Sequence, residues 1–194
     1  MSSRNAVLAE PVDAPTRILD AAARVLRVSD RRPGIAELAR QAGMSRPTVY
    51  RHFADEAAVF RALWEREIRR LMAQTPRTTD DRAGLVRQVV DLADRISTHE
   101  TLARTFVTEP ALVARYILDR LGTGQRVLLE SLRDAIGLVQ AGGSIRASEP
   151  TELAAMTLLI AQSAIQSRRM IADQLPDAAW RRELARALDG YLAP

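Results

Sequence analysis

The side chains best suited to binding another molecule are concentrated in one decapeptide, MSRPTVYRHF, at residues 44–53. It holds two arginines, a threonine, a tyrosine and one of the two histidines of the chain. An arginine fork matches the O6 and N7 acceptors of guanine, and hydroxyl or phenol groups reach phosphate oxygens. These residue types favour recognition of a polyanion over catalysis.

Several classes of function are excluded by what the sequence lacks. It has no cysteine, so disulfides, thiolate metal sites and a cysteine nucleophile are absent, and the two histidines stand too far apart for a zinc site. It also has no phosphate-binding glycine loop and no histidine placed near a serine and an acid at catalytic spacing. We therefore expect neither an enzyme nor a bound metal or cofactor.

The net positive charge of the chain lies entirely in residues 1–53, the part that ends with the decapeptide. The chain has 28 basic and 24 acidic residues, and every basic one is arginine. Residues 1–53 hold nine arginines and five acids, whereas residues 54–194 hold nineteen of each. A localised excess suggests a polyanionic partner, although an excess of this size also suits an ordinary surface. Without a long apolar run or a signal peptide, we expect a cytoplasmic protein that does not enter a membrane.

Helical periodicity surrounds the decapeptide. We expect a first helix from about Pro15 through TRILDAAARVL, and a second one, GIAELARQA, that is closed by Gly43. Ser45 is expected to cap a third helix, which Val49 and Phe53 anchor to the core. Two short helices joined at AGMS are typical of a helix-turn-helix, and equally of a helical corner in an ordinary bundle.

The rest of the chain is also predicted to be helical, so the expected fold class is all-α. Asp55 is expected to cap the helix EAAVFRALWEREIRRLMAQ. Further helices are expected over residues 80–97, 101–139 with interruptions at Pro110 and at residues 122–124, 151–174, and from Pro176 to the end. We predict a flexible arm (1–14), a helix-turn-helix domain (15–54) and a helical regulatory domain (55–194).

The segments ILDAAARVL and IAELARQAGMSRPTVYRHFADEAAVFRAL resemble the DNA-binding domain of the tetracycline-repressor (TetR) family of bacterial transcriptional regulators. The resemblance covers about residues 16–64 and implies an N-terminal three-helix DNA-binding domain followed by a helical ligand-binding and dimerisation domain. It implies that Arg46, Pro47 and Thr48 face base edges, that Tyr50 and His52 lie against phosphates, and that Arg51 reaches either. The expected DNA-binding residues are Ser45, Arg46, Pro47, Thr48, Tyr50, Arg51, His52, Arg31 and Arg32.

Three positions depart from the pattern of the family. Glu56 replaces a lysine that commonly contacts phosphate, Gly34 replaces a threonine that caps the second helix, and the link RVSDRRPG is one residue short with Asp30 in place of glycine. We expect Arg31 and Arg32 to supply compensating phosphate contacts. Changing both to alanine should make DNA binding less sensitive to salt, and an unchanged slope would contradict this.

The resemblance also implies a homodimer formed by the last two helices and an effector pocket among the middle ones. The expected interface residues are Met156, Ile160, Ala164, Ile171, Trp180, Leu184 and Leu188. The expected pocket residues are Phe60, Trp64, Leu92, Ile96, Phe106, Leu112, Tyr116 and Leu128, with His99, Arg104 and Glu109 as further polar groups. All of these apolar residues are equally suited to the core of a single chain.

The sequence therefore predicts a ligand-responsive transcriptional repressor. Its partners would be a palindromic operator in double-stranded DNA, a second copy of the chain and a small lipophilic effector. The alternative is a helical adaptor or scaffold whose helix-turn-helix does not bind DNA, because Glu56 and Gly34 remove two expected contacts. The residues leave open whether such a regulator represses or activates.

Overall fold

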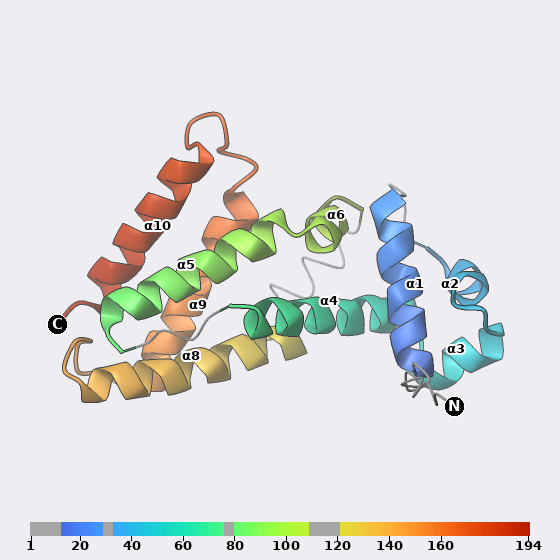
Figure 1. Cartoon of the computed structure of the whole chain (residues 1–194), viewed down its shortest axis with the longest axis horizontal. Coiled ribbons are helices and arrows are strands. Elements are labelled where there is room, and N and C mark those ends of the chain that lie inside the picture. Colours follow the sequence, from blue (N-terminus) through green and yellow to red (C-terminus); the bar gives the residue numbers. More distant parts are fainter. Residues whose placement is uncertain (1–12, 29–32, 76–79, 109–120) are drawn as a thin grey trace, which may run out of the picture. The chain divides into compact units, whose positions relative to one another are not determined.

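The computed structural model describes residues 13–28, 33–75, 80–108 and 121–194, and these form nine helices and no strand (Figure 1). The helices are α1 (Ala14–Val28), α2 (Ile35–Ala42), α3 (Arg46–His52), α4 (Glu56–Ala73), α5 (Arg82–Thr98), α6 (Glu100–Thr108), α8 (Thr123–Ala141), α9 (Pro150–Ser167) and α10 (Asp177–Leu192). The all-α fold expected from the sequence is confirmed. The chain divides into two compact units, unit 1 up to Leu63 and unit 2 from Trp64, with the boundary inside α4.

Unit 1 is built on the apolar face of α1. Asp13 Oδ1 accepts the Thr16 N–H at 3.0 Å, so the first turn of α1 is capped by a side chain. α1 packs against α2 and α3, and the side chains of Ile18, Leu38 and Val49 between them are fully buried. Burial of one such aliphatic side chain contributes about 1.5–3 kcal/mol, so this small core positions α3.

The turn between α2 and α3 follows the expectation from the sequence. Gly43 has φ 65° and ψ 43°, a left-handed conformation that costs a residue with a Cβ atom but not glycine. The Met44 N–H donates to the Ala39 carbonyl at 2.9 Å and closes the end of α2. Two residues later the chain enters α3, so a short and well-defined turn fixes the angle between the two helices.

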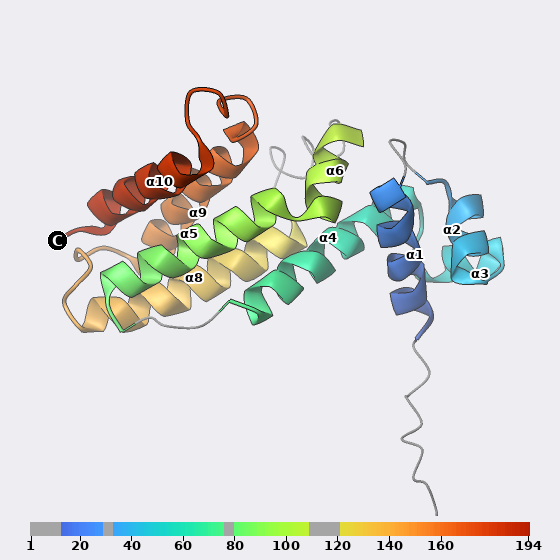
Figure 2. The same ribbon diagram turned by 45° about the horizontal axis from the view of Figure 1, so that its top comes forward.

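Unit 2 is a helical bundle in which α8 packs against α9, and α5 packs against α10 and α9 (Figure 2). Its main core includes Leu85, Ile136, Leu153, Trp180 and Leu188, all nearly or fully buried. The expected interruption at residues 122–124 is confirmed as the start of α8, whose N-cap is Gly122. The expected helix start at Pro110 lies outside the described residues.

The helix expected over residues 151–174 is shorter in the structure, because α9 ends at Ser167 and residues 168–175 form turns. Arg168 accounts for this difference. Its Nη1 donates to Asp94 Oδ1 at 2.7 Å and to Ser97 Oγ on α5, and its Nη2 donates to Asp177 Oδ1 at the start of α10 at 2.9 Å. Three partners on two other helices hold the chain in the turn that leads from α9 to α10.

The charge on Arg168 is kept although the residue is buried. Burial disfavours the charged guanidinium, but the hydrogen bonds to Asp177 and Asp94 outweigh this effect and raise the pKa of Arg168 above its ordinary value. The guanidinium also lies 4.4 Å from the centre of the Trp180 ring. This cluster joins α5, α9 and α10 through one cation.

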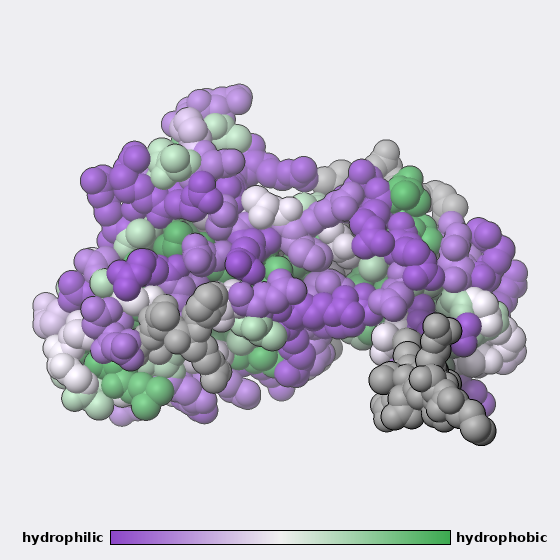
Figure 3. All heavy atoms as spheres, viewed as in Figure 1, coloured by the Kyte–Doolittle hydropathy of each residue, from purple (hydrophilic) through white to green (hydrophobic). Residues whose placement is uncertain are grey.

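The surface in the view of Figure 3 is mainly hydrophilic, and its hydrophobic areas are small and separate. In the described part of the chain, no helix is long and apolar enough to cross a membrane. The same part holds no group of three or more side chains that could ligate a metal ion.

Candidate functional site

The N-terminus of α3 is held by Ser45, as the sequence predicts. Ser45 Oγ accepts the Thr48 N–H at 3.2 Å, and the two hydroxyl groups are 2.8 Å apart. A hydroxyl can donate once and accept twice, so Thr48 retains hydrogen-bonding capacity beyond its contact with Ser45. Pro47 sits in the first turn, where a missing N–H costs no helical hydrogen bond.

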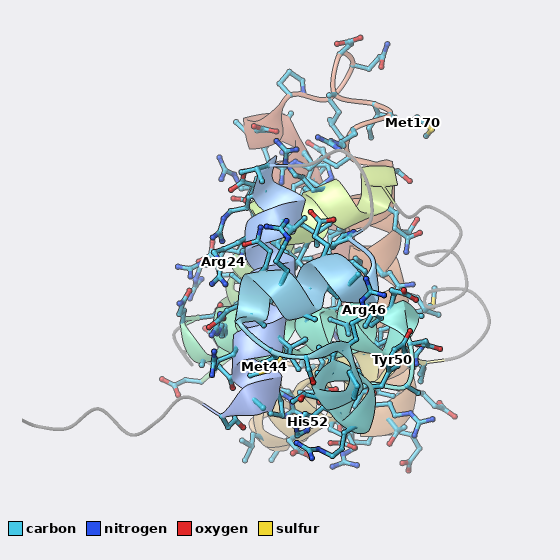
Figure 4. All side chains as sticks on the ribbon, turned by 90° about the vertical axis from the view of Figure 1, so that its right-hand side faces the viewer. Arg24, Met44, Arg46, Tyr50, His52 and Met170 are labelled. Carbon is cyan, nitrogen blue, oxygen red and sulfur yellow. The ribbon has the colours of Figure 1, made fainter. Side chains whose placement is uncertain are left out.

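The outer face of α3 is rich in exposed donors. Arg46, Arg51 and His52 are exposed, and Tyr50 is 54% exposed. Figure 4 shows the side chains of Arg46, Tyr50 and His52 extending outward from the helix. Val49 on the opposite face is fully buried. The structure thus brings together the expected DNA-binding residues 45–48 and 50–52 on one accessible surface.

Phe53 is less buried than its expected role as a core anchor requires. It is half-buried and serves as the C-cap of α3, where its N–H donates to the Val49 carbonyl at 2.9 Å. The anchoring of α3 therefore depends mainly on Val49. Arg31 and Arg32, the two further residues expected at DNA, lie outside the described residues.

Two arginines of α1 hold the end of α2, which the sequence analysis missed. Arg17 Nη2 donates to the Ala42 carbonyl at 2.7 Å, and Arg24 Nη2 donates to the Gln41 carbonyl at 3.1 Å. Cations at a helix C-terminus also interact favourably with the helix dipole. The available signal was their spacing of seven residues, which places both on one side of α1 beside its buried face.

A carboxylate occupies the start of α2. Gly34, the N-cap, has no side chain to accept a hydrogen bond, and Glu56 Oε1 accepts the N–H of Ile35 at 3.3 Å instead. A Cβ atom added to Gly34 would lie 4.0 Å from the same oxygen, so there is room for a small side chain. The two departures from the family pattern, Gly34 and Glu56, are therefore structurally coupled.

Unit 2 contains an apolar cavity of about 100 Å³. Among the expected pocket residues, Trp64, Leu92, Ile96 and Leu128 line it together. Its other walls come mainly from α9, through residues such as Leu158 and Gln162. In the described residues, no charged side chain lines the cavity.

A second cavity of about 240 Å³ lies beside the first, because both are lined by Val89, Leu92, Leu128 and Leu132. It is more polar than the first cavity, with Gln88, Thr75 and Ser131 in its wall. No charged side chain of the described residues lines this cavity either.

The remaining expected pocket residues lie elsewhere or outside the described residues. Phe60 is fully buried in unit 1. His99 caps α5, and its Nε2 is 3.9 Å from Glu67 Oε2, so it lies next to an acid and lines neither cavity. Leu112, Tyr116, Glu109 and the side chain of Phe106 are not described.

The residues expected at a dimer interface divide into two groups. Trp180, Leu184 and Leu188 are buried in the core of their own chain, at 2%, 5% and 0% exposure, and Ile160 and Ala164 pack partly against that core. Ile171 is half-buried in the turn after α9. Met156 is 44% exposed, and the neighbouring Leu159, which the sequence analysis did not single out, is 54% exposed.

A helix-turn-helix with an exposed, donor-rich second helix is the architecture of a DNA-binding transcriptional regulator. A family model described as bacterial regulatory proteins, tetR family, matches residues 18–63. The chain is 41% identical over 181 residues to an uncharacterised HTH-type transcriptional regulator of Mycobacterium bovis, covering 93% of this chain and 95% of that protein, and equally to one from Mycobacterium tuberculosis. The chain belongs to the TetR family of bacterial transcriptional regulators. Members of this family are not enzymes, which confirms the expectation from the sequence.

Solved structures share this fold at low sequence identity. A putative TetR-family regulator from Rhodococcus sp. has a TM-score of 0.68 and 19% identity, covering 93% of this chain and 98% of that one. The fatty acid degradation regulator FadR from Bacillus halodurans has a TM-score of 0.65 and 16% identity, covering 94% of this chain and 97% of that one. FadR from Bacillus subtilis in complex with stearoyl-CoA has a TM-score of 0.61 and 14% identity, covering 91% of this chain and 98% of that one.

Proposed function

We propose that the chain is a ligand-responsive transcriptional repressor that binds a palindromic operator in double-stranded DNA as a homodimer and is released by a small lipophilic molecule. The observation that carries this proposal is the exposed face of α3, where Arg46, Tyr50, Arg51 and His52 present four donor-bearing side chains. Val49, on the opposite face, anchors the helix to the core. The apolar cavity of unit 2 supports the part of the proposal that concerns the effector. We further propose a cytoplasmic location, where the operator is found.

The residues of α3 have different roles in this proposal. Arg46 is the first residue of the helix and is exposed, so its fork can enter the major groove and bind guanine O6 and N7. Thr48 contacts a base or a phosphate by donating its hydroxyl hydrogen, while its oxygen accepts from the Ser45 hydroxyl 2.8 Å away. Tyr50 and His52 bind phosphates and hold the helix in register.

A homodimer is proposed because one recognition helix contacts only a small area of DNA. Two half-sites about 34 Å apart give selectivity that a single seven-residue helix does not reach. The exposed face of α9 supports an interface, since Met156 and Leu159 are apolar, exposed and three residues apart on one helix. Exposed apolar side chains that cluster on one face are typical of sites of association.

The effector site is proposed in the apolar cavity of unit 2. Pockets of this kind, apolar with a few polar groups, bind lipophilic small molecules. The regulator from Bacillus subtilis was solved with stearoyl-CoA, which supports a lipophilic effector in a chain with the same fold.

Helix α4 is the proposed route from the cavity to DNA. It carries Trp64 and Ile68, which line the cavity, and it begins at Glu56, whose carboxylate holds the start of α2. A ligand that displaces Trp64 therefore shifts the helix that fixes the helix-turn-helix. The ligand then changes the affinity for DNA by the same factor by which DNA changes the affinity for the ligand.

The experiment that tests the proposal is fluorescence anisotropy with DNA from the region upstream of the gene and with DNA selected from random sequences. We expect binding that depends on sequence, falls steeply with salt and saturates at one dimer per palindrome. Arg46→Ala should weaken this binding, and Arg186→Ala, which removes an exposed arginine of α10, is the matched control.

The alternative is a helical adaptor whose helix-turn-helix does not bind DNA. The carboxylate of Glu56 at the start of α2 favours this alternative, because it places a negative charge where phosphate would approach. Absence of salt-sensitive, sequence-dependent binding on both kinds of DNA would refute the repressor and favour the adaptor.

A further inference from the structure

We propose that Arg17 of α1 is a positioning residue for operator recognition. Its hydrogen bond to the Ala42 carbonyl sets the direction of the first turn of α3, and so decides which base edges Arg46 reaches. This inference rests on the proposed function, since it concerns the same DNA-binding face. Three observations carry it: where α3 is anchored, what Arg17 contacts, and how short the turn before α3 is.

The apolar anchors of α3 lie in its second half. Of the seven residues of this helix only Val49 is buried, and the half-buried Phe53 follows at its C-terminus. Arg46 and Pro47, in the first turn, are exposed. Apolar contacts have no preferred direction, so these two anchors leave the first turn free to tilt. A further constraint is needed at the N-terminal end, which is the end that carries Arg46.

Arg17 provides a directional contact next to this end. Its Nη2 donates to the Ala42 carbonyl at 2.7 Å, and 25 residues separate the two along the chain. A hydrogen bond from a charged donor is shorter and roughly twice as strong as one between neutral groups. Ala42 is the last residue of α2, so its carbonyl has no partner within the helix. Since α2 and α3 both pack against α1, the contact fixes the end of α2 relative to the helix that supports the other two (Figure 1).

The guanidinium of Arg17 also lies beside the turn itself. A Cβ atom added to Gly43 would be 3.1 Å from Arg17 Nη2, which is closer than ordinary van der Waals contact. The φ of 65° at Gly43 already disfavours a side chain, and the guanidinium occupies the adjoining space. Arg17 therefore lies next to the residue at which the chain turns from α2 toward α3.

A displacement of Ala42 is passed on to Arg46, because the turn between them has little freedom to absorb it. Only three residues separate the two. Gly43 and Met44 donate their N–H groups to carbonyls of α2 at 3.2 and 2.9 Å, and Ser45 caps α3. Each residue of the turn is thus held by at least one hydrogen bond, and the end of α2 and the start of α3 move together.

The expected consequence of losing the Arg17 contact is weaker discrimination between bases. Recognition requires side chains within about 0.5 Å and 10–20° of the productive geometry, and a bidentate contact from Arg46 to guanine depends on two aligned hydrogen bonds. Contacts to phosphate carry no sequence information. A tilt of the first turn therefore lowers the preference at the base pair that Arg46 reads more than it lowers the affinity for all sequences.

The test compares Arg17→Met with the unaltered full-length protein on DNA that the unaltered protein selects from random sequences. Fluorescence anisotropy is measured on the selected operator and on operators with one base pair changed, and Arg46→Ala identifies the base pair that Arg46 reads. Arg17→Met should reduce the discrimination there by at least about three-fold, out of the roughly five- to 150-fold that one bidentate contact provides. A ratio of affinities does not depend on the fraction of protein that is folded, so a purely structural defect leaves it unchanged.

Three further variants make the comparison specific. Arg27→Met removes the same charge from an exposed position of α1 that holds no carbonyl of α2 among the described residues, so it should weaken binding to all sequences alike and keep the ratio. Arg17→Lys keeps the charge and a donor for the Ala42 carbonyl, so it should lose less discrimination than Arg17→Met. In the Arg46→Ala background, Arg17→Met should cause no further loss at that base pair, because the side chain through which it acts is gone.

Amide hydrogen exchange tests the contact without DNA. The Met44 N–H should exchange roughly three- to ten-fold faster in Arg17→Met, as expected when one hydrogen bond from a charged group is lost beside it. The N–H of Val25, in the second half of α1, should be unchanged. Equal acceleration at both amides would mean that Arg17 supports the whole unit and does not position the turn.

The inference is overturned if Arg17→Met keeps the discrimination at the base pair that Arg46 reads, if Arg27→Met reduces it as much, or if Arg17→Lys is no better than Arg17→Met. It is also overturned if Arg17→Met lowers this discrimination further in the Arg46→Ala background, or if exchange at Met44 does not change. Absence of any sequence preference in the unaltered protein is a different result, since it is the failure of the proposed function. Exchange at Met44 then still decides whether Arg17 positions the turn.

Discussion

The Glu56 carboxylate accepts the backbone N–H of Ile35 at 3.3 Å, although 21 residues separate the two along the chain. It provides from α4 the hydrogen bond that Gly34, without a side chain, does not provide within α2. A carboxylate at this position also interacts favourably with the positive end of the α2 dipole. The start of the helix-turn-helix is thus tied to the first turn of α4.

This contact predicts how α2 responds to substitution at both positions. Glu56→Ala should lower the stability of α2 by about 1 kcal/mol, the usual cost of a lost cap, and amide exchange at Leu38 should become about five-fold faster. Adding Gly34→Ser should restore most of the protection, because Gly34 has φ −77° and ψ 165°, which suit a serine N-cap. Equal exchange rates in Glu56→Ala and the unaltered protein would contradict the role of Glu56 as a cap.

The same carboxylate predicts an effect on DNA affinity. Glu56→Gln keeps an oxygen that can accept from Ile35 and removes the charge that repels phosphate. We expect tighter binding to all DNA sequences alike, with no change in the preferred operator, when anisotropy is measured at low salt. Glu152→Gln makes the same change in charge at an exposed position in the first turn of α9 and should have no effect.

Arg46 and Tyr50 are predicted to act differently on DNA. Arg46→Ala should relax the preference at one base pair in each half-site by about 1–3 kcal/mol, because a bidentate contact to guanine is lost. Tyr50→Phe should weaken binding to all sequences by a similar factor, because a phosphate contact carries no sequence information. Anisotropy with a set of operators, each with one base pair changed, separates the two effects. A uniform loss in both variants would refute the division of roles.

The sequence predicted best those features that depend on a few neighbouring residues. Ser45 as the cap of α3 and Gly43 as the residue that closes α2 were both expected and are confirmed, because each depends on chemistry within one turn of helix. Asp55 was likewise expected as the cap of α4, and its Oδ1 accepts the N–H of Ala58 at 2.6 Å.

Contacts between distant residues could not be predicted in the same way. The carboxylate of Glu56 on Ile35 and the guanidinium of Arg17 on Ala42 depend on how helices pack, and an isolated glutamate or arginine gives no sign of its partner. An apolar stripe also does not indicate what covers it. Trp180 and Leu188 had the spacing expected of an interface, but they are buried within their own chain.

Arg168 is predicted to be the residue of the turn after α9 on which stability depends most. Arg168→Met should lower the free energy of unfolding by about 2–4 kcal/mol, because Asp94 and Asp177 lose the cation that they share and the Trp180 ring loses its contact with the guanidinium. The lower half of that range is favoured, since Asp94 keeps a second partner in Arg181, with Nη1 to Oδ2 at 2.8 Å.

The control for Arg168 is an arginine whose ion pair is exposed. Arg182→Met removes an ion pair to Glu183 on the surface, which contributes at most about 0.5–1 kcal/mol. Urea unfolding followed by circular dichroism compares the two variants. Similar losses in both would show that the Arg168 cluster does not hold the bundle together.

The exposed face of α9 is predicted to be the part of the surface that joins two copies of the chain. Leu159→Glu places a charge at a position that is 54% exposed in the single chain, so the variant should fold with nearly unchanged stability. In a dimer the same charge would be buried against an apolar surface without a partner, at a cost of several kcal/mol in each subunit. Light scattering at micromolar concentration should therefore find a dimer for the unaltered protein and a monomer for Leu159→Glu.

The control for Leu159 is Leu138→Glu on α8, an equally drastic change at a position that is 73% exposed. It should leave the dimer intact if the interface is formed by α9. A variant that is monomeric should also bind a half-site with the affinity of one recognition helix and lose its preference for the palindrome, because the second helix no longer contributes. If Leu138→Glu separates the subunits and Leu159→Glu does not, the interface lies on α8 and the assignment to α9 is wrong.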